Sequence, residues 1–250
     1  MKLNYLLEGR GDKTIVFIHG LSNSLDYWRI LSAQLGEKYR ILLYDLRGHG
    51  KTPYSPFTMD LLVEDLHDLL LNLNISKASL AGLSLGGNVA LSFALKYPGM
   101  VEKLVLMSTF SEVDDTLKSR FGEFKTAVRN SYEEFYDVIM DYVLPEDILN
   151  ENRELLEFYK KEAAKSANQK AIENGIDIGL DFYVTPKLKY LSCPVLILAG
   201  KDDILTSTDL SQIMNDNIED SRLVIFENTK HNLLIDRNKS EIVELMRRFI

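Results

Sequence analysis

The sequence predicts an α/β fold: a mostly parallel, doubly wound sheet of about seven strands with an inserted helical cap. Short, continuous apolar runs alternate with segments of helical period along most of the 250 residues. Continuous apolar runs are typical of strands that are covered on both faces of a parallel sheet. Residues 111–186 carry helical patterns and no strand-like run. This order indicates right-handed βαβ units with one helical insertion.

Six apolar runs are the expected strands, because they are short and rich in Leu and β-branched residues. They cover residues 14–20, 40–45, 78–84, 103–109, 194–200 and 222–228. Patterns of helical period lie between or after these runs. They cover residues 24–39, 58–74, 85–98, 206–217 and 239–249. We expect Thr58 to cap the second of these helices, although Leu61 stands where a capping box has Glu.

The insertion divides the chain. Residues 1–110 and 187–250 are expected to form the core domain, and residues 111–186 a helical cap, or lid. Aromatic residues are frequent among its helical patterns: Phe121, Phe124, Tyr132, Phe135, Tyr136, Tyr142, Phe158 and Tyr159. Aromatic side chains at helical spacing usually pack in a core. An insertion rich in them can also form the roof of a pocket.

Composition excludes several classes of partner. The net charge of −8 argues against nucleic acid, since neutralising phosphates needs a surplus of Lys and Arg. The N-terminal segment becomes polar after seven residues, too soon for a signal peptide or a membrane span. The single cysteine, Cys193, is expected to be buried and inert and fits a reducing compartment. We therefore expect a cytoplasmic protein without a membrane or nucleic-acid partner. Its oligomeric state is left open.

Ser84 is the expected nucleophile. It lies in Gly82-Leu83-Ser84-Leu85-Gly86, a G-x-S-x-G pattern with a strand before it and a helix after it. A strand that turns directly into a helix strains the central residue, and the glycines remove Cβ atoms that would collide. The hydroxyl is then exposed at the carboxyl edge of the sheet, where open α/β folds bind ligands. A plain turn serine is the alternative, which two glycines in register disfavour.

A serine hydroxyl needs a base to take its proton, and the chain has four histidines. His231 is the best candidate, because it follows the last expected strand in a loop that can reach across the carboxyl edge. His67 lies in a helical pattern among carboxylates. His19 ends the first strand-like run, and His49 lies in a glycine-rich loop.

The histidine in turn needs a carboxylate that fixes its tautomer and stabilises the imidazolium. Asp202 and Asp203 directly follow the apolar run 194–200, at the same edge of the sheet. The order Ser, Asp, His along the chain is that of the nucleophile-elbow arrangement. One aspartate of the pair can instead serve a turn or the N-cap of the next helix, so the residues alone leave the choice open.

Two backbone N–H groups are expected to form the oxyanion hole. Leu85 directly follows the nucleophile, and Leu21 lies in the loop after the first strand-like run. Such donors contribute about 10²- to 10³-fold each to the rate. Because only backbone atoms act, the identity of the two side chains matters little.

Together these segments resemble the α/β-hydrolase superfamily, and the resemblance covers nearly the whole chain. The segments are FIHGLSNS, YDLRGHGKT, AGLSLGG, LAGKDD and the C-terminal His231, in order and at sensible separations. The resemblance implies an acid at the fourth position of a G-x-x-D pattern, which selects Asp203 over Asp202. In some members the acid follows the sixth strand instead, which would point to one of three residues. These are Glu112, Asp114 and Asp115.

The chain also departs from the family pattern. Lys230 precedes His231 where the family usually has glycine, and Thr52 stands where the loop pattern usually has serine. The chain starts at what resembles the family's second strand, so the first is expected to be missing. The loop with Asp45, Arg47 and His49 resembles a structural loop near the mouth of the site, which implies no catalytic role for His49.

The resemblance implies a serine esterase. The expected reaction is hydrolysis of a carboxylic ester with a small to medium acyl group through an acyl-enzyme, without metal or cofactor. The nearest alternatives are an enol-lactone hydrolase and a carbon–carbon bond hydrolase or lyase on the same scaffold. Asn88 counts against the menaquinone-pathway lyase, which commonly has an arginine in this region. A low-turnover ligand receptor is the alternative from another class. A serine nucleophile disfavours haloalkane dehalogenases and epoxide hydrolases, which have an aspartate at that position.

Overall fold

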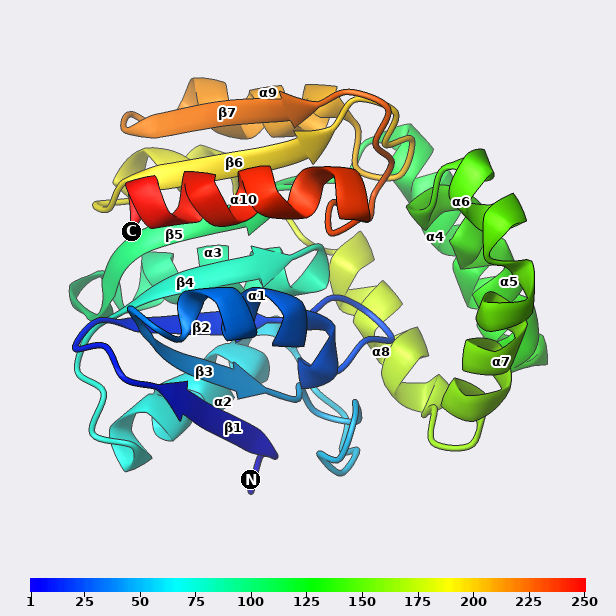
Figure 1. Ribbon diagram of the computed structural model, residues 1–250, viewed down its shortest axis with the longest axis horizontal. Helices are drawn as coiled ribbons and strands as arrows, with labels where there is room; N and C mark the ends of the chain where they lie inside the picture. The colour runs from blue at the N-terminus through cyan, green and yellow to red at the C-terminus, as the bar shows by residue number, and fades with distance from the viewer.

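The computed structural model describes residues 1–250, which form a seven-stranded sheet with helices on both faces (Figure 1). The strand order is β1-β3-β2-β4-β5-β6-β7, and every neighbouring pair is parallel except β1 and β3. The strands are β1 Tyr5–Gly9, β2 Thr14–Ile18, β3 Arg40–Tyr44, β4 Ala78–Leu83, β5 Val101–Met107, β6 Val195–Gly200 and β7 Ser221–Phe226. The predicted fold class is confirmed.

Five helices cover the two faces of the sheet. They are α1 Arg29–Leu35, α2 Met59–Asn72, α3 Leu85–Lys96, α9 Thr208–Asn217 and α10 Asp236–Phe249. Alternate residues of the strands point to opposite faces. One set packs with α1 and α10, and the other set packs with α2, α3 and α9. Both faces of the central strands are therefore buried, which is why their sequences are continuously apolar. Thr58 caps α2 as expected, since its side chain accepts a hydrogen bond from the Leu61 N–H.

Strand β1 is the element that the apolar runs did not predict. It lies at the edge of the sheet and pairs antiparallel with β3. None of its five residues is fully buried, so its sequence YLLEG lacks the continuous apolar pattern of the inner strands. Its two leucines, Leu6 and Leu7, are partly buried and pack against the hydrophobic clusters on the two faces of the sheet.

The segment between β5 and β6 contains no strand, and we call its five α-helices the cap. They are α4 Asp115–Asn130, α5 Tyr132–Val143, α6 Glu146–Glu151, α7 Arg153–Ala164 and α8 Gln169–Leu180. In Figure 1 the cap lies at the end of the sheet toward which the parallel strands point. Its aromatic interior centres on Phe124, whose ring contacts those of Phe121, Phe135 and Tyr142. Helices α6 and α7 bury no residue fully.

The two ends of this helical segment meet at the sheet. The Val184 N–H donates to the Ser111 carbonyl at 2.8 Å, and the hydroxyls of Ser111 and Thr185 are 2.7 Å apart. The chain therefore leaves the core and returns to it at nearly the same place. Separately, none of the helices in the structure combines the length and the apolarity needed to cross a bilayer.

Candidate active site

Ser84 has the strained conformation that the G-x-S-x-G pattern predicts. It lies between β4 and α3 with φ 51° and ψ −119°, a region that residues with a Cβ rarely occupy. Hydrogen bonds hold it there. The Ser84 N–H donates to the Met107 carbonyl at 2.9 Å, and the Ser84 carbonyl accepts from the Gly87 N–H and the Thr109 hydroxyl, both at 2.8 Å. The neighbouring strand and helix thus stabilise the strained residue.

The flanking glycines are required because backbone lies where a Cβ would be. A Cβ on Gly82 would be 2.3 Å from the Gly86 carbonyl oxygen. A Cβ on Gly86 would be 2.2 Å from the carbonyl oxygen of Ile18 in β2. Neither backbone oxygen can move without breaking the sheet or the turn. The sharp strand-to-helix turn therefore depends on glycine at both positions.

A buried carboxylate holds the predicted general base. His231 lies in the loop between β7 and α10, and its Nδ1 is 2.9 Å from Oδ2 of Asp203. Both side chains are almost completely buried. A carboxylate at Nδ1 keeps the proton on that nitrogen, which leaves the lone pair of Nε2 free to accept a proton.

The two adjacent aspartates have different surroundings in the structure. Oδ1 of Asp203 accepts hydrogen bonds from the N–H groups of Leu205 and Thr206 at 2.8 and 2.9 Å, and Oδ2 faces His231. Asp202 is exposed, and its carboxylate makes no hydrogen bond. Of the two aspartates, only Asp203 contacts His231.

Thr206 is a site residue that the sequence analysis did not identify. Its hydroxyl is 2.7 Å from Oδ2 of Asp203 and 3.1 Å from Nδ1 of His231. Since the carboxylate only accepts, the hydroxyl donates to Asp203 and restrains its rotation. The signal in the sequence is the D-x-x-T spacing, which resembles a local side-chain turn.

The alternative acids lie elsewhere. Asp114 caps α4 by accepting a hydrogen bond from the Leu117 N–H at 2.7 Å. Glu112 and Asp115 make no contact with an imidazole, and none of the three lines the cavity that contains Ser84.

The residues of both predicted oxyanion donors line the same cavity as Ser84. Leu85 is the first residue of α3, so its N–H has no acceptor within the helix. Leu21 follows β2, and its N–H donates to no atom of the protein. Helix α8 of the cap packs directly on this loop. A Cβ on Gly175 would be 2.5 Å from Cδ1 of Leu21, so a larger residue there would require the Leu21 side chain to move.

The other three histidines do not line the cavity that contains Ser84. His19 Nδ1 donates to the Gly20 carbonyl at 2.8 Å, and its Nε2 accepts from the Leu46 N–H at 3.0 Å. Burial and the nearby His49 lower the pKa of His19 to about 3. Burial also lowers the pKa of His49. His67, in α2, stacks on the ring of Tyr97 at the end of α3. His231 is the one histidine that lines the cavity.

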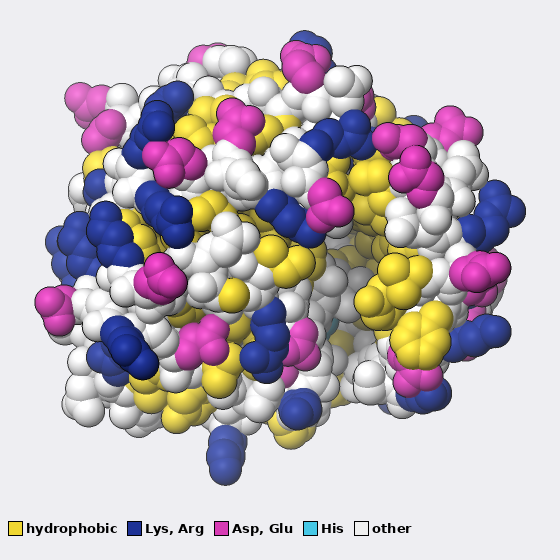
Figure 2. Space-filling view, in the orientation of Figure 1, with side chains coloured by type: hydrophobic (Ala, Val, Ile, Leu, Met, Phe, Trp, Pro, Cys, Tyr) yellow, Lys and Arg dark blue, Asp and Glu magenta, His cyan; other side chains and the backbone are white.

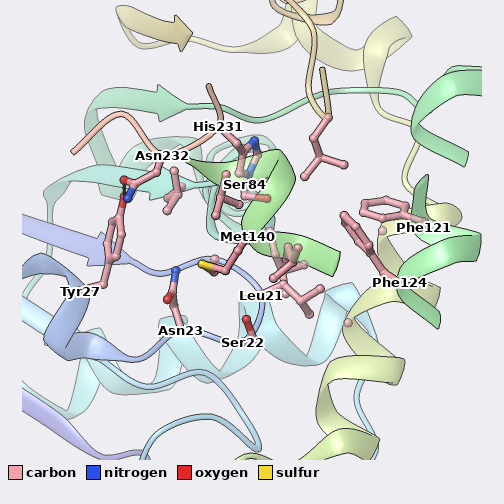
Figure 3. Close-up of a pocket in the computed structure, with 18 of the residues that line it drawn as sticks. Leu21, Ser22, Asn23, Tyr27, Ser84, Phe121, Phe124, Met140, His231 and Asn232 are labelled. Atoms are coloured by element: carbon pink, nitrogen blue, oxygen red, sulfur yellow. Dashed lines mark hydrogen bonds between the residues drawn. The ribbon is translucent and has the colours of Figure 1, made fainter. Parts of the chain in front are cut away.

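Ser84 and His231 open into a cavity of about 250 Å³ between the core and the cap. No hydrogen bond joins the Ser84 hydroxyl to the imidazole, and such catalytic contacts often tighten only when substrate binds. Figure 3 shows Phe121 and Phe124 on one side of Ser84, and Tyr27 and Asn232 on the other. Apolar residues make up most of the wall: Leu21, Tyr27, Leu83, Leu85, Phe110, Phe121, Phe124, Ile139, Met140, Val143, Leu144, Leu156 and Leu205.

A second, wider cavity of about 740 Å³ lies next to the first. Ser22, Asn23, Ile139 and Met140 line both, so they separate the two spaces. In the space-filling view the surface is hollowed between the core and the cap (Figure 2). The second cavity is lined by Arg29, Lys51 and several carboxylates, whereas no Lys, Arg, Asp or Glu lines the first. The structure contains no group of three or more metal-ligating side chains.

Comparisons with known proteins agree with this fold. Residues 13–238 match the family described as the alpha/beta hydrolase fold. The chain is 29% identical over 200 residues to the proposed carbamate hydrolase RutD of Pantoea ananatis, covering 77% of this chain and 72% of the relative. It is 24% identical over 228 residues to 3-oxoadipate enol-lactonase 2 of Acinetobacter baylyi, covering 90% and 85%.

A solved structure is similar over almost its full length. It is MGS-M2, an alpha/beta hydrolase enzyme from a deep-sea metagenome library of the Medee basin. The TM-score is 0.90 at 21% identity, covering 99% of this chain and 93% of that one. The family resemblance of the sequence is therefore confirmed, and this chain is a hydrolase that belongs to the α/β-hydrolase fold family.

Proposed function

We propose that the protein is a serine esterase, with Ser84 as nucleophile, His231 as general base and Asp203 as the orienting acid. One observation carries the proposal. A serine at positive φ on a strand-to-helix turn shares a cavity with the histidine whose Nδ1 lies 2.9 Å from a buried aspartate. A strained serine that lines the same cavity as an oriented imidazole is the arrangement that nucleophilic acyl transfer needs.

The proposed reaction has two acyl-transfer steps. Nε2 of His231 takes the proton of Ser84 as the hydroxyl attacks the ester carbonyl, and then gives it to the leaving alcohol. The N–H groups of Leu21 and Leu85 stabilise the negative charge on the former carbonyl oxygen. Water then attacks the acyl-enzyme with the same histidine as base, which releases the acid and restores Ser84.

The cavity limits the size and the charge of the substrate. An apolar cavity of about 150 Å³ holds a benzene molecule, so 250 Å³ corresponds to about ten non-hydrogen atoms. No cationic side chain lines this space, and an unpaired carboxylate within it would be strongly disfavoured. The substrate is therefore an uncharged ester whose acyl and alcohol parts are both small to medium.

Hydrolysis of p-nitrophenyl esters from acetate to decanoate by the parent protein and by Ser84→Ala tests the proposal. We expect turnover to be highest for the short acyl chains and to fall toward decanoate, because a cavity of about 250 Å³ has little room for a long chain. Loss of Ser84 should reduce kcat by as much as about 10⁶-fold if the three residues act as a unit. Turnover at the parent rate in Ser84→Ala would refute the mechanism.

A lactone is the second candidate substrate. A relative that shares 24% identity over 90% of this chain is named an enol-lactonase, and a lactone ring fits within about ten non-hydrogen atoms. Uncharged lactones assayed beside the esters distinguish the two. A fluorophosphonate that labels Ser84 stoichiometrically, in a protein that turns over neither class, would show an active nucleophile with a different substrate, such as a carbamate.

A further inference from the structure

The wall of the cavity that contains Ser84 and His231 has two chemically different sides. From this difference we draw an inference that rests on the proposed function. Phe121 and Phe124 form an aromatic side that offers no polar atom (Figure 3). On the opposite side lie Asn23, Asn232 and Tyr27. Buried polar groups beside a binding cavity fix the orientation of a ligand, so the partners of these three side chains decide what they can bind.

The amide of Asn232 is held in one orientation. Its Oδ1 accepts hydrogen bonds from the Tyr27 hydroxyl at 2.8 Å and from the Leu234 N–H at 3.0 Å. Removal from water raises the pKa of Tyr27, so the phenol stays protonated and donates. Two donors face the oxygen, and the NH₂ group must therefore be on the other side of the amide. That NH₂ group has no acceptor in the protein.

Asn23 provides a second free amide. Its backbone N–H closes the turn after β2 by donating to the Gly20 carbonyl, but its side chain makes no hydrogen bond within the protein. The side chain lines both the active cavity and the wider cavity beside it. Asn23 is therefore available to a ligand at the boundary between the two spaces.

The position of His231 indicates which half of the ester meets this polar side. The imidazole must reach the alcohol oxygen in order to protonate it, and Asn232 is the next residue along the chain. The acyl group then points away from His231, toward the aromatic side. We propose that Asn23 and Asn232 are specificity-determining residues that donate hydrogen bonds to an acceptor oxygen in the alcohol part of an uncharged ester. The preferred alcohol is thus a hydroxyl- or ether-bearing one rather than a plain alkyl alcohol.

Two matched pairs of esters, each of about ten non-hydrogen atoms, test this assignment. The first pair is n-butyl butanoate and 2-methoxyethyl butanoate, which differ by one CH₂-to-oxygen exchange in the alcohol. The second pair is n-butyl butanoate and n-butyl methoxyacetate, in which the exchange is in the acyl group. Release of acid is followed by pH-stat to obtain kcat/KM for the parent protein, Asn23→Ala and Asn232→Asp. Comparing ratios between proteins cancels the intrinsic reactivity of each ester.

Asn232→Asp keeps the oxygen that Tyr27 and Leu234 need and replaces the NH₂ donor by a second carboxylate oxygen. The negative charge that it adds acts on both esters of a pair, so only the ratio between the two esters is compared. We expect each variant to reduce the preference for 2-methoxyethyl over n-butyl butanoate by about three- to tenfold, the effect of one neutral hydrogen bond. The preference within the acyl pair should stay within twofold. Phe124→Leu, on the aromatic side, is the control and should leave the alcohol preference unchanged.

The outcomes separate this inference from the proposed function. If n-butyl butanoate is hydrolysed in a Ser84-dependent way and the variants leave the alcohol ratio unchanged, the inference is wrong and the esterase proposal stands. A loss confined to the acyl pair would show that the ester binds in the reverse orientation, which also overturns it. Absence of Ser84-dependent turnover of any of these esters would refute both.

Discussion

Replacing Asp203 by Asn tests the proposed acid at nearly constant shape. Oδ1 of Asp203 faces two backbone donors, the N–H groups of Leu205 and Thr206 at 2.8 and 2.9 Å. The oxygen of the new amide must take that position, because an NH₂ group there would meet two other donors. The NH₂ group is then placed where Oδ2 now lies, 2.9 Å from Nδ1 of His231.

The consequence is the wrong histidine tautomer. An NH₂ group that donates to Nδ1 moves the ring proton to Nε2, and a protonated Nε2 cannot accept the proton of Ser84. Loss of the correct tautomer in a triad reduces kcat by about 10⁴-fold, which corresponds to about 5.4 kcal/mol in activation free energy. We expect this loss for Asp203→Asn, with KM for p-nitrophenyl butanoate changed little.

Asp202→Asn is the matched control, because Asp202 is exposed and its carboxylate has no partner. The assay is kcat for p-nitrophenyl butanoate in the two variants and the parent, with urea unfolding to show that each protein is folded. Asp202→Asn should retain more than about half of the parent kcat, as expected for a surface substitution. A greater loss in Asp202→Asn than in Asp203→Asn would refute the assignment of the acid.

Three further predictions concern stability and substrate range. The folded state lowers the pKa of His19 from 6.5 to about 3 and that of His49 in the same direction. The unfolded chain therefore binds more protons than the folded one. The contribution of His19 to the free energy of unfolding is fully present above pH 6.5 and decreases toward pH 3 by up to about 1.4 kcal/mol per pH unit. Urea unfolding at pH 7, 6 and 5 measures this slope, which His19→Gln should reduce. Gly86→Ala should destabilise the protein by several kcal/mol or prevent folding, because its Cβ would lie 2.2 Å from a backbone oxygen. Gly99→Ala is the control: its Cβ would have no atom within 4 Å, so the free energy of unfolding should change by less than about 0.5 kcal/mol. Equal melting temperatures of the two variants would contradict this prediction. Phe124→Leu should move the preferred acyl chain of p-nitrophenyl esters to a longer length, and an unchanged length profile would show that this ring does not bound the acyl site.

Much of the fold could be predicted because the inner strands are buried on both faces. Their apolar runs are continuous, and each predicted run overlaps a strand of the structure. Strand β1 could not be found in this way, since none of its residues is fully buried. The first helical pattern was overestimated: residues 25–28 form a 3₁₀ turn, and the α-helix covers only Arg29–Leu35.

Part of the candidate site could also be predicted, because its residues lie in short motifs at the ends of strands. Ser84, Asp203 and His231 each follow a strand, and parallel strands bring their carboxyl ends to one edge. The polar side of the cavity was not predicted. Tyr27 and Asn232 are 205 positions apart and meet only because the 3₁₀ turn at residues 25–28 packs against the loop after β7. Neither belongs to a motif, and a single sequence shows no link between them.

Because the two ends of the helical segment between β5 and β6 lie side by side, the segment can change in evolution without changing the sheet. The chain leaves the sheet at Ser111 and returns at Val184 and Thr185, which hydrogen-bond to it. The strands therefore do not depend on how many residues lie between these points, and doubling the length of a flexible connection costs only about 0.6 kcal/mol in closure entropy. Insertions, deletions or exchanges of residues 112–183 can thus remodel the cap side of the cavity, while Ser84, Asp203 and His231 are inherited unchanged at the edge of the sheet.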